Sequence, residues 1–143
     1  MNDFLEKKLI ESKIKRYLPK NKTIANYRPY IFSNNFIFIS GQLPITNQGI
    51  VNTGKIDNNF LIKEIEEAIE ISTSNLLWNL NDCISSIKNQ IKTIQCCSLK
   101  GYFNCVDDFK DHSKLLDFSS NLIVNILGNS GFHSRVAVGV SSL

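Results

Sequence analysis

The chain has few of the residues that would place it in a specialised class. Its 143 residues include four cysteines, three prolines, two histidines and one tryptophan. The cysteines form no C-x-x-C pair, and the histidines complete no zinc pattern with them, so nothing here indicates a zinc module. We expect all four cysteines to be small buried or half-buried side chains. They are Cys83, Cys96, Cys97 and Cys105.

Long apolar runs and a strong charge of one sign are also missing. No stretch approaches the roughly 18 apolar residues that a membrane-spanning helix needs, and the N-terminus lacks the apolar block of a secretory signal. We therefore expect a cytoplasmic protein. The net charge of +3 is too small to indicate a nucleic-acid partner. The basic excess is local, because residues 1–28 hold eight Lys or Arg and three Asp or Glu.

What is present is an ordinary globular pattern, long enough for one domain with a core of its own. The spacing of apolar residues predicts helices over 3–18, 60–84 and 113–127, and strands over 23–32, 35–43, 91–103 and from near Ser134 onward. Pro19 ends the first helix, and Ser33-Asn34-Asn35 forms the turn between the first two strands. Asn58 or Asn59, and Ser113, are the expected N-caps of the two long helices, and Gly128 ends the second one.

This order of elements predicts an α+β fold with one mixed sheet and both long helices on one face. Residues 1–20 add an amphipathic helix with a lysine-rich outer side. That helix either packs on the domain with its lysines in solvent or contacts a membrane or RNA. The second face of the sheet would be bare and apolar, and a symmetric oligomer is an economical way to cover it.

A turn that contains Gly128 and Gly131 precedes the last strand and places Arg135 at the start of it. Side chains alternate between the two faces of a strand. The valine face consists of Val136, Val138 and Val140, and the arginine face of Arg135, Ala137 and Gly139. The valine face suits a core. The arginine face carries two residues too small to cover the guanidinium, which would leave a cation beside an open space.

The chain has 13 lysines but only three arginines, so Arg135 stands out. An arginine kept in such a background indicates a need for its planar, bidentate fork, which lysine does not supply. The alternative is a surface arginine beside a turn. His133, two residues earlier, is either a pocket acid or base or a turn histidine with its hydrogen bonds satisfied, and His112 is expected to be a surface residue at a helix start.

Several blocks, in order and with fitting gaps over residues 23–143, resemble the RidA/YjgF family of reactive-intermediate deaminases. They are Tyr27-Arg28-Pro29, Ser40-Gly41-Gln42-Leu43-Pro44, Thr53-Gly54-Lys55-Ile56, Asp107-Asp108-Phe109 and His133-Ser134-Arg135 with the strand that follows. The chain is most similar to the longer subgroup, often labelled endoribonuclease L-PSP or translation initiation inhibitor.

The resemblance implies a chorismate-mutase-like fold that forms a homotrimer with ligand clefts between subunits. It implies hydrolysis of reactive enamines and imines to 2-keto acids and ammonia, without a metal or organic cofactor. Arg135 would hold the substrate carboxylate as the catalytic anchor. Tyr27, Ser40, Gly41 and Ala137 would line the substrate pocket.

Two positions depart from the family pattern. Ala137 stands where several active deaminases have a cysteine. The family also continues into a further strand with a water-positioning glutamate, whereas this chain ends at Leu143. Either the sequence is a truncated form or it has lost that strand and its carboxylate. We therefore divide it into an N-terminal helix, 1–20, and a RidA/YjgF-like domain, 21–143, in which that strand is not seen.

Three functions follow from these observations. The first is a trimeric imine deaminase acting on small carboxylates. The second is a non-catalytic protein of the same fold that binds 2-keto acids or similar carboxylates. The third, which the sequence supports least, is RNA cleavage or translational control, because basic and aromatic residues are not interleaved as in single-strand binders.

Overall fold

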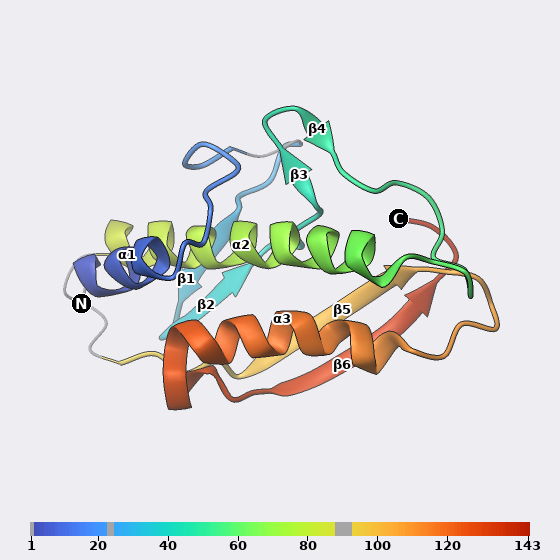
Figure 1. The fold of residues 1–143 in the computed structure, drawn as a ribbon. Coiled ribbons are helices and arrows are strands. Elements are labelled where there is room, and N and C mark those ends of the chain that lie inside the picture. Colours follow the sequence, from blue (N-terminus) through green and yellow to red (C-terminus); the bar gives the residue numbers. More distant parts are fainter. Residues whose placement is uncertain (1, 23–24, 88–92) are drawn as a thin grey trace.

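The computed structural model describes residues 2–22, 25–87 and 93–143 (Figure 1). Its helices are α1 (Asn2–Glu11), α2 (Ile62–Ser86) and α3 (His112–Leu127), followed by a short 3-10 turn, η1 (Gly128–Gly131). Its strands are β1 (Tyr30–Ser33), β2 (Phe36–Ile39), β3 (Ile45–Thr46), β4 (Gly49–Ile50), β5 (Ser98–Asn104) and β6 (Ser134–Val140). The predicted α+β class is confirmed. No helix among the described residues is both long and apolar enough to cross a membrane.

The strands pair in twos. β1 and β2 form an antiparallel hairpin, β3 and β4 form a second one, and β5 runs parallel to β6 through the crossover helix α3. Within the described residues the strands therefore do not join into the one continuous sheet that we expected. Helices hold each pair instead: α2 contacts β1 and β2, and α3 contacts β5 and β6. The two long helices lie side by side (Figure 1).

Local sequence sets most element boundaries. Asn34 and Asn35 both have positive φ, 48° and 64°, which fits a tight hairpin turn between β1 and β2. Gly128 ends α3 with φ of 61°. The predicted N-caps are wrong, because Leu61 and Asp111 occupy those positions and neither makes a side-chain cap hydrogen bond. Asn58 instead donates to Asp108, 3.0 Å away. The strands predicted over 23–32, 35–43 and 91–103 are shorter in the structure, where they are β1, β2 and β5. Residues 23–24 and 91–92 of these predictions lie outside the described residues.

The first helix ends at Glu11 and not near residue 18. Lys13 adopts a left-handed φ of 58°, the amide of Lys13 donates to the Ile10 carbonyl, and the amide of Ile14 donates to the Leu9 carbonyl. This is the Schellman pattern that closes a helix. Ile14 is 7% exposed, so its helix-like spacing reflects burial after a chain reversal and not a continued helix.

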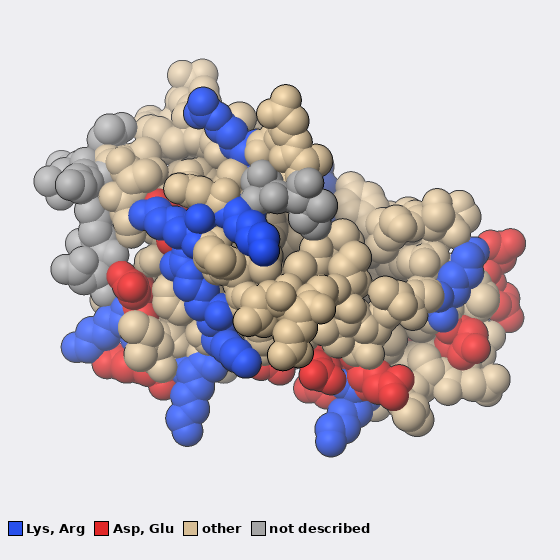
Figure 2. All heavy atoms as spheres, turned by 90° about the horizontal axis from the view of Figure 1, so that it is seen from above, with Lys and Arg blue, Asp and Glu red and all other residues tan. Residues whose placement is uncertain are grey.

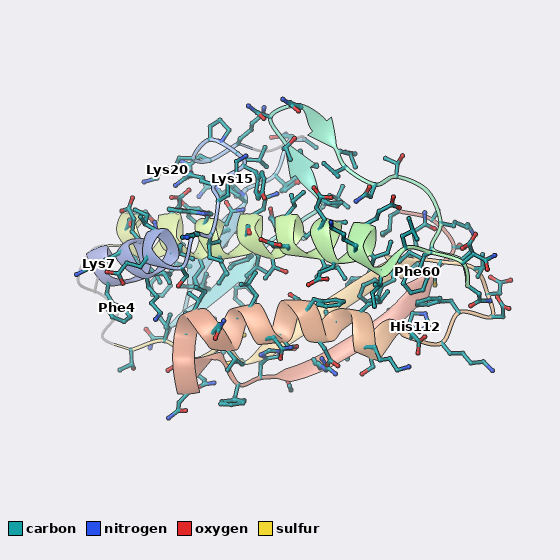
Figure 3. The ribbon with its side chains drawn as sticks, viewed as in Figure 1. Phe4, Lys7, Lys15, Lys20, Phe60 and His112 are labelled. Carbon is teal, nitrogen blue, oxygen red and sulfur yellow. The ribbon has the colours of Figure 1, made fainter. Side chains whose placement is uncertain are left out.

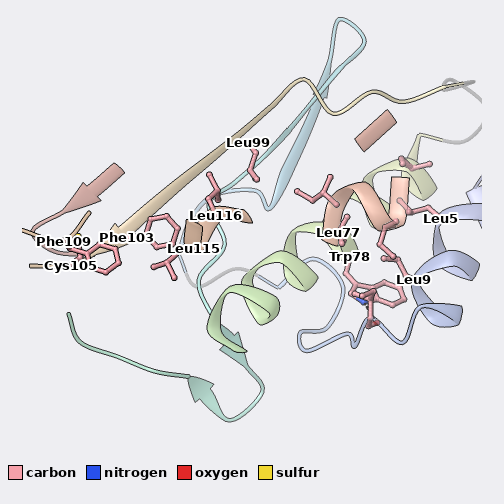
Figure 4. Close-up of a cluster of buried hydrophobic side chains, with 14 residues drawn as sticks. Leu5, Leu9, Leu77, Trp78, Leu99, Phe103, Cys105, Phe109, Leu115 and Leu116 are labelled. Carbon is pink, nitrogen blue, oxygen red and sulfur yellow. Dashed lines mark hydrogen bonds between the residues drawn. The ribbon is translucent and has the colours of Figure 1, made fainter. Parts of the chain in front are cut away.

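One core unites the N-terminal helix with the rest of the chain. Leu9 and Leu77 are fully buried, and Leu5, Ile14 and Trp78 belong to the same cluster (Figure 4). The cluster continues between α3 and β5 through Leu99, Phe103, Leu115 and Leu116. The lysine-bearing helix thus packs on the domain.

A buried ion pair fixes the segment after α1 to α2. The two guanidinium nitrogens of Arg16 donate to the two carboxylate oxygens of Asp82, one at 3.1 Å. The Asp82 side chain is only 4% exposed. The guanidinium also lies 5.0 Å from the Trp78 ring centroid, and the Trp78 indole donates to the Ile14 carbonyl. One side chain therefore satisfies a carboxylate that has almost no access to water.

The arginine face of β6 turns toward α3, which reverses our expectation for the two faces. A Cβ added at Gly139 would lie 2.6 Å from His112 Nε2 and 2.7 Å from Cys105 Sγ. On β5, the strand paired with β6, a Cβ added at Gly101 would lie 2.7 Å from a Leu116 methyl. The small residues on this face therefore admit α3, and they do not leave a space beside the arginine.

The valine face is the uncovered one in the single chain. Val136 is 50% and Val138 37% exposed. Tyr102 on β5 is similarly exposed, and so are the hairpin residues Ile31, Phe36 and Phe38. We call these six residues the outer apolar set. These side chains leave apolar area of the strands in contact with water in the single chain.

The buried Arg16–Asp82 pair gives the first prediction. Arg16→Met should lower the free energy of unfolding by about 2 kcal/mol, since it leaves the Asp82 carboxylate buried without its partner. Urea unfolding followed by circular dichroism measures the change. Lys7→Met is the matched control, because Lys7 and Glu11 form an exposed pair at 3.8 Å, and it should change stability by less than about 0.5 kcal/mol. Equal effects would contradict the assignment.

The contact of α3 with β6 gives the second prediction. Gly139→Ala should cost about 1–3 kcal/mol of stability, because the added methyl overlaps His112 and Cys105. Gly41→Ala is the control, since a Cβ there meets nothing within 4 Å. Adding His112→Ala to Gly139→Ala should restore part of the loss by making room. Thermal unfolding that ranks the two alanine variants equally would refute this packing.

Candidate functional site

Arg135, the residue on which the sequence places most weight, lies at the start of β6 against α3. Its Nη1 forms an ion pair with Asp117 Oδ1 at 2.7 Å and donates to Ser120 Oγ at 3.2 Å. Its Nη2 donates to Ser113 Oγ at 2.9 Å. The side chains of Arg135 and Asp117 are 29% and 54% exposed, so water reaches this pair. The guanidinium thus already holds a carboxylate of its own chain.

The three α3 residues that contact Arg135 were not found from the sequence. Ser113, Asp117 and Ser120 are spaced i, i+4 and i+7, which puts them on one face of a helix. That spacing was the available signal. Ser113 is not the helix cap that we expect from the sequence, because its hydroxyl accepts from Arg135.

His133 extends the same network. Its Nδ1 lies 2.6 Å from the Gly131 carbonyl oxygen, and its Nε2 lies 3.0 Å from Ser120 Oγ. A carbonyl only accepts, so Nδ1 carries a proton, and in the neutral ring Nε2 accepts from the Ser120 hydroxyl. Ser120 Oγ in turn accepts from Arg135. Both ring nitrogens are satisfied, as in the turn-histidine interpretation.

Tyr27, Ser40 and Gly41 come together at a different place. Tyr27 and Gly41 line a hollow of about 40 Å³, together with Leu18, Lys22, Pro29, Gln42, Leu43 and Ile45. Ser40 Oγ donates to the Arg28 carbonyl at 2.6 Å, and the Ser40 amide donates to the Pro29 carbonyl at 2.9 Å. These bonds tie the segment before Gly41 to the chain around Tyr27. Lys22 was not among the predicted site residues.

Within one chain the predicted residues therefore form two groups. Arg135 belongs to the network on α3, and Ala137 is partly buried against the core. The hollow at Tyr27 is lined only by residues between 18 and 45, so neither Arg135 nor Ala137 reaches it. A pocket that used both groups would need two copies of the chain.

A thiol and an imidazole meet at the start of α3. Cys105 Sγ lies 3.3 Å from His112 Nε2, and the His112 ring packs edge-on against Phe109 at 5.1 Å between centroids. Figure 3 shows His112 close to Phe60, which packs on Phe109. The expectation of a surface histidine is wrong, since the ring is half-buried. In the part of the chain that the structure describes, no third metal-ligating side chain joins this pair.

Burial disfavours the thiolate form of two further cysteines. Burial raises the pKa of the Cys83 thiol and that of Cys96, which keeps both protonated at neutral pH. Cys97 is exposed, contrary to our expectation for all four cysteines.

Known proteins are similar to this chain in sequence or in fold. The Agrobacterium tumefaciens protein Atu1372, of unknown function, is 30% identical, with 99% of this chain and 86% of that one covered and a TM-score of 0.76. A structure described as a putative endoribonuclease from Shewanella oneidensis is 22% identical, covers 97% and 89% of the two chains, and has a TM-score of 0.79. Protein TCP17 of Trypanosoma cruzi is 25% identical over 120 residues, 83% of this chain and 73% of its own length.

The family model that matches is described as "YjgF/chorismate mutase-like, putative endoribonuclease". It covers residues 8–141 and so includes both the Arg135 network and the hollow at Tyr27. The fold of the Shewanella structure agrees with it. The chain belongs to the YjgF/chorismate mutase-like family.

Proposed function

We propose that this protein is a RidA-like enamine and imine deaminase that works as a homotrimer. It hydrolyses small reactive imines to 2-keto acids and ammonia, and Arg135 holds the substrate carboxylate. The observation that carries the proposal is the guanidinium at the start of β6, which binds a carboxylate in a water-accessible position. Membership of the YjgF/chorismate mutase-like family supports the fold on which this proposal rests.

In this proposal the Asp117 carboxylate occupies the place on Arg135 that the substrate carboxylate takes when substrate binds. An ion pair between partly exposed side chains contributes at most about 1 kcal/mol, so a substrate carboxylate can replace Asp117 on Nη1. Ser113 and Ser120 keep the fork oriented during the exchange, because their hydroxyls accept from Nη2 and Nη1. The planar fork then fixes the substrate with the imine carbon in one position.

The reaction needs few groups besides the arginine that binds the substrate carboxylate. Water adds to the imine carbon, and a proton reaches the nitrogen, which gives a carbinolamine. The C–N bond then breaks, ammonia leaves with the bonding pair, and the hydroxyl oxygen loses its proton to form the ketone. No electron is gained or lost. Holding the carboxylate and excluding competing orientations lowers the entropic part of the barrier.

The outer apolar set supports the trimer. In one chain Phe38 is 61% and Val136 50% exposed, and contact between copies would remove that area from water. Association would also let the hollow at Tyr27, Ser40 and Gly41 of one copy face Arg135 of the next. A pocket divided in this way explains why the single chain keeps the two groups apart.

Carboxylate binding without turnover is the second candidate. It is favoured by His133, whose two ring nitrogens are both hydrogen-bonded within the chain, and by Ala137, which offers no reactive side chain. Both candidates use Arg135 as the anchor, and they differ in whether wild-type protein accelerates release of the keto acid.

The anchor is tested by two substitutions with opposite effects. Arg135→Ala should abolish accelerated release of 2-keto acid from an enamine that a dehydratase generates in the cuvette. Asp117→Asn should lower KM about threefold, because it removes the competing carboxylate from Arg135. Wild-type protein no faster than Arg135→Ala would refute the enzyme. Calorimetric pyruvate binding that depends on Arg135 would then favour the binder, and Arg135-dependent cleavage of single-stranded RNA would contradict both.

The trimer is tested on the outer apolar set. Phe38→Asp and Val138→Asp should each convert a species of three chains into monomers, since either places a carboxylate in an apolar contact. Light scattering after size-exclusion chromatography measures the mass. Ile10→Asp is the control, because Ile10 is as exposed, at 62%, but lies on α1. A wild-type monomer at micromolar concentration would contradict the assembly.

A further inference from the structure

The chain carries a long stretch without any acid. Residues 12–56 contain no Asp or Glu and seven Lys or Arg, and we call this the acid-free segment. Arg16 is neutralised by Asp82. Lys13, Lys15, Lys20, Lys22 and Arg28 have no ion pair among the residues that the structure describes. Figure 2 shows Lys and Arg side chains gathered on the left of the view, and Figure 3 places Lys15 and Lys20 on that side.

The hollow at Tyr27 belongs entirely to this segment. All eight lining residues fall between Leu18 and Ile45, so no carboxylate lines it. Lys22 is the charged residue among them, and it also lines the adjoining hollow beside Arg16 and Trp78. The Asp82 carboxylate lines that adjoining hollow but is paired with Arg16, so Lys22 and the neighbouring lysines are the charges that would attract an anion to the hollow at Tyr27.

The frame around the hollow is held by hydrogen bonds. Gln42 Nε2 donates to the Ser40 carbonyl at 2.8 Å, and the Lys22 amide donates to the Pro19 carbonyl at 3.3 Å. At Gly41 an added Cβ would meet nothing within 4 Å, so the approach to the backbone is open. A space of about 40 Å³ suits a small charged group better than a whole metabolite.

We infer that Lys22 is a specificity residue that binds a second carboxylate, and that the preferred substrates are 2-imino dicarboxylates. The inference rests on the proposed function and deepens it. The 2-carboxylate lies on Arg135 of one copy, and the carboxylate of the substrate side chain enters the hollow of the neighbouring copy. Lysine suits this role because its ammonium is a point charge that donates to side-chain carboxylates at several angles.

The experiment compares two imines under identical conditions. An amino-acid oxidase generates the dicarboxylic imine from aspartate and the monocarboxylic imine from alanine, with O₂ as the oxidant for that preceding step. Hydrolysis itself consumes water and releases ammonia and the keto acid. The measured quantity is the ratio of kcat/KM for the dicarboxylic imine to that for the monocarboxylic one.

Lys22 is exposed, so Lys22→Met should lower this ratio about fivefold, the upper range for an exposed charge pair, and Lys22→Arg should keep most of it. Lys20→Met is the matched control, because Lys20 is exposed in the same acid-free segment but does not line the hollow. A ratio unchanged in Lys22→Met, or lowered equally in Lys20→Met, would overturn the inference.

Calorimetry separates this failure from failure of the proposed function. Oxaloacetate, the dicarboxylic product, should bind wild-type protein more tightly than pyruvate, and Lys22→Met should remove the difference. If wild-type protein hydrolyses neither imine but shows this Lys22-dependent difference, the deaminase proposal is wrong and the second carboxylate site stands. If it hydrolyses both without preference and binds both products equally, the site is wrong and the deaminase stands.

Discussion

The close approach of α3 to β5 and β6 is the constraint on which the rest of the structure depends. It is possible only because Gly101 and Gly139 lack a Cβ where Leu116, His112 and Cys105 arrive. That contact decides which face of β6 is covered. Since the alternation of side chains is fixed, it also decides that Arg135 meets α3 and that Val136 and Val138 remain outside.

Both halves of the proposed function follow from that orientation. The guanidinium is held by Ser113, Asp117 and Ser120, which gives it a fixed direction and a replaceable carboxylate partner. The two outer valines of β6 are exposed, as are Phe36 and Phe38 on the β1–β2 hairpin. An anchor held on one side of the strand and an uncovered apolar surface on the other suit a pocket formed between copies.

The lysines and the arginines lie in different surroundings. The acid-free segment wraps the hollow at Tyr27, while the one arginine of that segment with a buried partner, Arg16, serves the core through Asp82 and Trp78. Arginine and lysine are thus used for different purposes. The paired forks of Arg16 and Arg135 hold carboxylates in defined geometry, and the lysines supply a diffuse positive field.

The sequence by itself determined the α+β class, both long helices to within two residues, the start of β6 at Ser134 and the family resemblance, because these depend on local periodicity, turn residues and motif order. It could not show that Ile14 is buried by a chain reversal, that His112 meets Cys105, or that Lys22 joins Tyr27 and Gly41. Those are contacts between segments distant in the chain. Only the tertiary structure decided which face of β6 is buried, because alternation defines two faces equally and packing against α3 chooses between them.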